Sequence, residues 1–138
     1  MKPMPASLRF VLILLGLGTL GAAVSIIVQY RAGEERARDA AEAMTGGRAK
    51  AGKGAIARFG CGACHIIPGI DHASGRVGPS LRALARRAMI AGRLSNEPGA
   101  LVAWIRTPEH VSPDTAMPQQ RMSEREARDI AAYLYTLR

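Results

Sequence analysis

The feature that most constrains this chain is an uncharged run of nineteen residues near its start, from Phe10 to Val28. As a helix, this run covers roughly the 30 Å of hydrocarbon in a bilayer. It ends in bulky Ile26, Ile27 and Val28, without the small-residue pattern of a signal-peptide cleavage site. We therefore expect residues 1–30 to form a retained transmembrane anchor and not a cleaved signal peptide.

The composition changes after the apolar run. Residues 31–44 are rich in Ala, Glu and Arg, and they predict a polar helix that prolongs the anchor and stops at Gly46-Gly47. Residues 45–54 carry four glycines and three basic residues, which is typical of a flexible link. We expect residues 31–51 to be a helical and flexible tether, and residues 52–138 to be one domain. That domain is near the lower size limit for folding without a disulfide, a bound metal or another stabilising group.

The segment Cys61-Gly62-Ala63-Cys64-His65 carries the most specific chemistry in this domain. Its C-x-x-C-H spacing is that of covalent c-type haem attachment, with one thioether from each cysteine and the histidine as iron ligand. A redox dithiol is expected within a thioredoxin-like βαβ pattern, which is absent. A zinc site would need two more ligands, and His72 and His110 are the only further histidines.

A rigid turn follows the motif at Gly78-Pro79-Ser80-Leu81. A ligating histidine normally donates its second ring N–H to an acceptor, which fixes its tautomer. The carbonyl of Pro79 is well suited to accept that bond from His65.

A methionine lies fifty-two residues beyond His65, in the segment Thr115-Ala116-Met117-Pro118. Its thioether is a soft ligand for haem iron. Prolines 108, 113 and 118 favour a non-helical loop around it. Met117 is therefore the preferred sixth ligand, with Met122 next and Met89 and His110 as further rivals.

The rest of the domain has helical patterns. Ser123 and Glu126 form a capping box, and after them one apolar face comprises Ala127, Ile130, Ala131, Leu134 and Leu137, with Arg125, Arg128 and Asp129 pointing elsewhere. Further helices are expected over Gly52–Phe59, Ser80–Ala91 and Pro98–Arg106. No segment has the alternation of a strand, so the predicted fold class is all-α.

Taken together, CGACH, GPSL, the AMP loop and the terminal ARDIAAYLYTLR resemble the class I c-type cytochromes over residues 52–138. The stretch IAGRLSNEPGALVAWIRTPEHVSPDTAMP is most similar to membrane-associated bacterial members that serve, or are fused to, terminal oxidases. The resemblance implies a small helical domain around one haem c, held by Cys61 and Cys64 and ligated by His65 and Met117, with Pro79 accepting from His65.

The same resemblance implies that the first and last helices of the domain cross. Either Gly52 or Gly54 would be the close-contact glycine, facing Tyr133 and Leu134. It also implies that Arg93 and Trp104 lie near the haem propionates. Because bacterial C-x-x-C-H haem attachment takes place outside the cytoplasmic membrane, the domain is expected in the periplasm, on a single-pass anchor in the inner membrane.

A haem with two protein ligands has no open site for substrate, so we expect an electron-transfer protein and not an enzyme. From residue 48 onward there are fourteen basic and seven acidic residues, a balance that favours acidic redox partners. The expected partners are a quinol-cytochrome c reductase as donor and a haem-copper oxidase as acceptor, without nucleic acid or a small-molecule substrate. A fixed haem subunit of an oxidase or dehydrogenase complex is the first alternative, and a haem-based sensor is the second.

Overall fold

The computed structural model describes residues 5–138, and the chain divides into two compact units at Glu35/Arg36. Helix α1 runs from Ala6 to Thr45 and contributes to both units. The first unit contains the predicted membrane segment, and its large apolar side chains are exposed, for example Phe10 at 62%. Helix α1 is long and apolar enough to cross a membrane, and no part of its most apolar stretch is buried in the protein.

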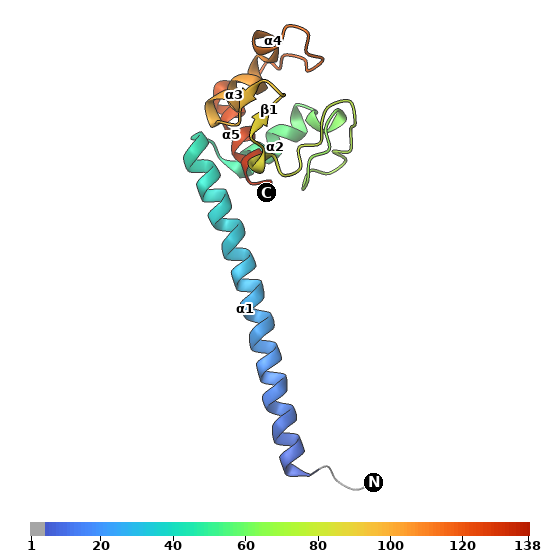
Figure 1. Cartoon of the computed structure of the whole chain (residues 1–138), viewed down its shortest axis with the longest axis vertical. Helices are drawn as coiled ribbons and strands as arrows, with labels where there is room; N and C mark the ends of the chain where they lie inside the picture. Colours follow the sequence, from blue (N-terminus) through green and yellow to red (C-terminus); the bar gives the residue numbers. More distant parts are fainter. Residues whose placement is uncertain (1–4) are drawn as a thin grey trace. The chain divides into compact units, whose positions relative to one another are not determined.

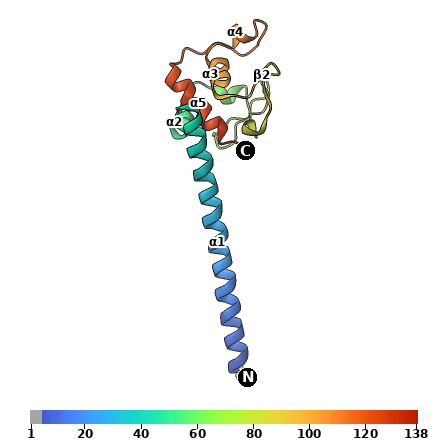
Figure 2. The ribbon, with the colours of Figure 1, turned by 60° about the vertical axis from the view of Figure 1, so that its left-hand side comes forward.

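The second unit is mostly helical, as predicted. It contains α2 (Ala49–Arg58), α3 (Pro98–Arg106), α4 (Pro108–Val111) and α5 (Glu124–Tyr135). Two 3-10 turns cover Cys61–Ala63 and Leu84–Arg86. The two-residue strands β1 (Met89–Ile90) and β2 (Leu94–Ser95) pair antiparallel, with Ile90 opposite Leu94. Helices α2, α3 and α5 lie together in both ribbon views (Figure 1 and Figure 2).

Helix α5 begins at the predicted capping box. The hydroxyl of Ser123 accepts from the Glu126 N–H at 3.2 Å, and the Glu126 carboxylate accepts from the Ser123 N–H at 2.9 Å. The predicted apolar face is also confirmed, since Ala127, Ile130, Ala131 and Leu134 are buried.

Asp129 differs from the prediction. It was expected to point away from the packed face, but only 6% of it is exposed and it accepts from the backbone N–H of Arg48 at 2.6 Å. The reason is long-range: the neighbouring segment offers an N–H just before helix α2, and a carboxylate at that place satisfies it.

The capping box makes stability depend on pH. Hydrogen bonds from Ser123 lower the pKa of the Glu126 carboxyl below its usual 4.5. A lowered folded-state pKa contributes stability that is present above the unfolded value and lost as the pH falls through the folded value. We expect Ser123→Ala to lower the free energy of unfolding by about 1 kcal/mol at pH 7. The difference from the wild type should shrink only in part at pH 3, because protonation of Glu126 weakens the bond from the Ser123 hydroxyl to the carboxylate but not the bond from the Glu126 N–H to that hydroxyl. Urea unfolding at the two pH values measures the difference; an equal difference at both would show that the bond from the hydroxyl to the carboxylate contributes no stability.

Helices α2 and α5 cross at Gly52. A side chain there would overlap the backbone carbonyl of Asp129 and lie 2.9 Å from the N of Ile130. Gly54 meets only the end of Arg58, at 3.9 Å. The close-contact glycine is thus Gly52, and its partners lie one helical turn before the expected Tyr133 and Leu134.

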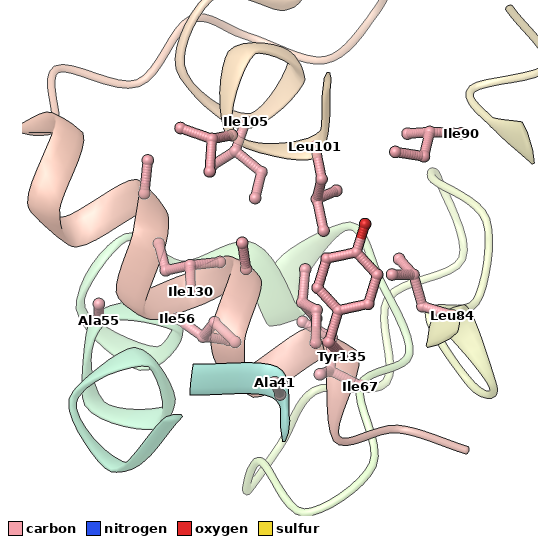
Figure 3. Close-up of a cluster of buried hydrophobic side chains, with 14 of the residues drawn as sticks. Ala41, Ala55, Ile56, Ile67, Leu84, Ile90, Leu101, Ile105, Ile130 and Tyr135 are labelled. Carbon is pink, nitrogen blue, oxygen red and sulfur yellow. The ribbon is translucent and has the colours of Figure 1, made fainter. Parts of the chain in front are cut away.

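The core lies where α2, α3 and α5 meet the loops between them. Figure 3 shows Ile56 of α2, Leu101 and Ile105 of α3, and Ile130 of α5 pointing into one cluster. Ala41, near the end of α1, belongs to the same cluster and is 1% exposed.

Three further predictions about local structure are corrected. Residues 80–91 are not a helix: Ala83 has a left-handed backbone with φ 49°, and only Leu84–Arg86 form a turn. Pro108–Val111 form one helical turn, α4, where a wholly non-helical segment was expected, because Pro108 at its first position fits the start of a helix.

The third correction concerns the link over residues 45–54, which was expected to be flexible. It is packed, and from Ala49 it is helical. Gly47 is buried because its backbone lies directly against that of Arg128. Glycines that indicate flexibility in the sequence serve here as close-contact positions. The limits of 31–51 and 52–138 stay predictions.

Candidate haem site

The two cysteines are placed by the end of helix α2. After Arg58 the chain turns through Gly60, which has φ 67°, and enters the 3-10 turn Cys61–Ala63. The N–H of His65 donates to the Cys61 carbonyl at 3.0 Å, which closes the motif into a compact turn. Cys61 and Cys64 are free thiols, and both line the same cavity.

His65 has its second ring nitrogen engaged as predicted. Its Nδ1 lies 2.7 Å from the Pro79 carbonyl oxygen. A carbonyl only accepts, so Nδ1 carries the proton and Nε2 is left as the metal donor. The turn is held close by the Gly78 N–H, which donates to the Cys64 carbonyl at 2.8 Å. Any side chain at Gly78 would collide with the His65 ring.

The candidates for the sixth ligand have different surroundings. Met117 is half-buried and lines the cavity with Thr115, whose hydroxyl accepts from the Met117 N–H at 3.2 Å. Met122 packs in the hydrophobic core instead and is 8% exposed. Met89 lines the cavity but is 47% exposed, and His110 is not among the lining residues. The geometry therefore favours Met117.

Of the two residues expected near the haem propionates, only one lines the cavity. Trp104 of helix α3 lines the cavity, whereas Arg93 is exposed and is not among the lining residues. A different arginine lines the cavity: the guanidinium of Arg87 donates to the carbonyls of Ser80 and, at 3.0 Å, Arg82. Sequence reasoning missed Arg87, because nothing local distinguishes it from Arg82 or Arg86.

The cavity has a volume of about 580 Å³, within the range of roughly 300–1,000 Å³ usual for cofactor sites. Apolar side chains make up much of its wall, including Ile56, Leu101, Ile105, Ile130 and Leu134 from the three large helices of the domain. Burial raises the pKa of the Cys61 thiol. Reactive redox dithiols need the opposite shift, so the surroundings of Cys61 do not favour a disulfide-exchange site.

The similarity of this chain to a known protein family explains why these cysteine, histidine and methionine side chains share one cavity. The sequence model of the family described as cytochrome c matches residues 49–138. The chain belongs to the cytochrome c family. Members of this family carry haem c, which gives the two-cysteine motif its covalent partner.

The residues of this cytochrome fit a haem c. The cavity is large and apolar, two thiols line its wall, and His65 keeps one nitrogen free for iron. Cys61 and Cys64 would hold the group covalently, His65 and Met117 would bind its iron, and Arg87 and Trp104 would form part of the wall around it. A haem filling this space also explains how a domain with few aromatic residues completes its core.

Among curated proteins, one relative is a cytochrome c oxidase subunit 2 from Alkalihalophilus pseudofirmus, 35% identical over 79 residues. The match covers 56% of this cytochrome but only 22% of the relative, so the chain spans about a fifth of that protein's length. No solved structure gives a significant match.

Proposed function

We propose that this cytochrome is anchored in the bacterial inner membrane by α1 and passes single electrons from a quinol-oxidising complex to a terminal oxidase. The observation that carries the proposal is one cavity lined by Cys61, Cys64, His65 and Met117. When bound there, haem supplies an iron that alternates between two oxidation states differing by one electron. The family relationship establishes electron transfer; the donor and acceptor are the proposal.

The chain's own residues favour electron transfer over catalysis. The Pro79 carbonyl fixes the tautomer of His65, so that Nε2 carries no proton and can donate its lone pair to iron. The Met117 loop supplies a soft donor from the same cavity. If His65 and Met117 both bind the iron of a haem held there, the chain leaves no ligand position for a substrate, and we propose that the protein is not itself an enzyme.

Charge near the cavity supports an acidic redox partner. Residues 72–96 contain five arginines and no acidic residue. The same stretch supplies much of the cavity wall, from Val77 to Gly92, and Val77 is 79% exposed. A positive surface around an exposed apolar edge attracts an acidic docking site and leaves a dry contact for electron transfer.

The relative supports the identity of the acceptor. In that protein, a segment similar to 79 residues of this chain belongs to a chain named cytochrome c oxidase subunit 2. We infer that the domain here serves an oxidase of this kind from a separate chain. Haem attachment to C-x-x-C-H outside the bacterial cytoplasmic membrane supports a periplasmic location for the domain.

A fixed haem subunit of an oxidase or dehydrogenase complex is the alternative, favoured by the packing of the end of α1 into the domain. Haem-stained gels of membranes solubilised in mild detergent separate the two. A haem band at the 14.7 kDa of the chain is expected under denaturing conditions, and its absence would end the proposal. On native gels, migration with an oxidase supports a subunit, and migration alone supports a carrier.

The axial assignment is tested by comparing two methionine variants. Met117→Ala should abolish the red-region iron–sulfur charge-transfer band, lower the reduction potential and allow carbon monoxide to bind the reduced protein. Met122→Ala should keep the band but lose about 2–5 kcal/mol of stability, because it leaves a core cavity. An intact band in Met117→Ala would contradict the assignment. Carbon monoxide binding to the unmodified reduced protein would favour a sensor instead.

A further inference from the structure

One short stretch of backbone carries the acceptor of the His65 ring. Pro79 has no backbone N–H, so its carbonyl, which accepts from His65 Nδ1 at 2.7 Å, is its only hydrogen-bonding group. Pro79 is also exposed, so water can compete for that carbonyl. The residues around it must therefore hold the carbonyl in place, and we call residues 78–82 the Pro79 turn.

The haem motif holds the Pro79 turn from one side. The N–H of Gly78 donates to the Cys64 carbonyl at 2.8 Å, and the N–H of Leu81 donates to the Ile66 carbonyl at 2.9 Å. Cys64 and Ile66 are the two residues that flank the ligating histidine. These two bonds use N–H groups of the turn and leave its carbonyls for another partner.

Arg87 holds the Pro79 turn from the other side. Its Nη2 donates to the carbonyls of Ser80 and, at 3.0 Å, Arg82. The Arg87 side chain is half-buried and lines the same cavity as His65. Because the two carbonyls come just after Pro79, the guanidinium fixes the direction in which the backbone leaves that residue.

Neutral hydrogen bonds anchor Arg87 itself to the core. The side-chain amide of Asn96 donates to the carbonyls of Leu84 and Arg87, at 2.8 Å each. The Asn96 side-chain oxygen accepts from the Tyr135 hydroxyl at 2.9 Å. Tyr135 belongs to helix α5, is 6% exposed and lies among the core side chains (Figure 3). The backbone of Arg87 is thus tied to a core helix while its side chain binds the Pro79 turn.

We propose that Arg87 is a positioning residue for His65: by fixing the Pro79 turn, it sets the strength of the hydrogen bond from His65 to the Pro79 carbonyl, and with it the reduction potential of the bound haem. The inference rests on the proposed ligation of iron by His65. A strong bond from Nδ1 raises the basicity of the ligand. A more basic ligand favours the oxidised iron, so a weaker bond raises the reduction potential.

The positioning role is tested by hydrogen exchange in the reduced, haem-loaded, full-length protein in detergent micelles, followed by nuclear magnetic resonance. Arg87→Met removes both side-chain donors and keeps an unbranched apolar side chain at the cavity wall. Arg86→Met is the matched control, because Arg86 is exposed and adjacent in the chain. The exchange rates of the His65 Nδ1–H and the Leu81 N–H report on the Pro79 turn directly.

We expect both protons to exchange about tenfold faster, or more, in Arg87→Met, because hydrogen bonds from a charged group are stronger than neutral ones. The control should exchange at the rate of the unmodified protein. Unchanged exchange in Arg87→Met would overturn the proposal, and so would an equal increase in Arg86→Met. The absorption spectrum of each variant shows whether its haem is bound.

Arg87→Lys tests the link to the haem without a change of charge. The lysine nitrogen lies one bond short of the arginine Nη2, so the bonds to the turn are weakened and the positive charge stays. We expect a reduction potential above that of the unmodified protein, and an equal or lower value would overturn the link. None of these measurements needs a redox partner. A protein with the expected exchange rates that no membrane complex oxidises would therefore defeat the proposed electron route and still support the role of Arg87.

Discussion

The double replacement of Cys61 and Cys64 by serine is expected to remove all covalently held haem from the protein. These are the only cysteines in the chain, and both line the cavity, so no other thiol can form a thioether. Haem that still enters the site should be extracted by acid acetone, and the haem-stained band near 15 kDa should disappear from denaturing gels. Each single replacement leaves one thioether and should retain the band.

Ala63→Ser is the matched control for this experiment. It introduces the same side chain between the two cysteines, at an exposed position of the same turn. Its haem should remain attached, which separates the loss of a thiol from a general effect of serine in the motif. Covalent haem in the double variant would contradict the attachment site. Loss of haem in the control would show instead that the turn itself fails to form.

Gly52→Ala and Gly54→Ala should have opposite effects, although the chemical change is identical and the two glycines lie in one helix. At Gly52 the new methyl group would overlap the Asp129 carbonyl, so α2 and α5 must move apart. We expect a loss of about 3 kcal/mol or more, at the upper end of the cost of overpacking. At Gly54 the methyl group meets no backbone, and we expect a gain of about 1 kcal/mol from helix propensity.

Urea unfolding of the haem-loaded proteins measures both changes, followed by absorption in the Soret region and by far-ultraviolet circular dichroism. The absorption spectrum before denaturant shows whether each variant has loaded its haem. Equal midpoints for Gly52→Ala and the wild type would show that the two helices do not cross at this residue. If Gly54→Ala lost as much stability as Gly52→Ala, both glycines would lie at the contact between α2 and α5.

The parts of the fold that the sequence predicts are those decided by neighbouring residues. Helix α3 begins and ends as predicted, because Pro98 fits a first turn. The capping box at Ser123 is equally local. The haem motif, the Pro79 contact with His65 and the Met117 loop follow from chemistry that short segments carry by themselves.

The parts of the fold that the sequence does not predict depend on hydrogen-bond partners far along the chain. The stretch from 80 to 91 has helical spacing, but the N–H of Leu81 donates to Ile66 and the N–H of Ala85 donates to Leu137. The Asn96 side chain donates to the carbonyls of Leu84 and Arg87, which a helix would use itself. These competing bonds also place Arg87 at the cavity and leave Arg93 outside it.

The crossing of α2 and α5 also sets an order of events during biogenesis. These are the first complete helix and the last helix of the domain, so its core closes only once α5 has been synthesised. Cys61 and Cys64 both precede α5 in the chain, so the two thiols are made before the helix that completes the core. A chain that stopped before α5 would contain both haem-attachment cysteines but would lack the part of the cavity wall that Ile130 and Leu134 form.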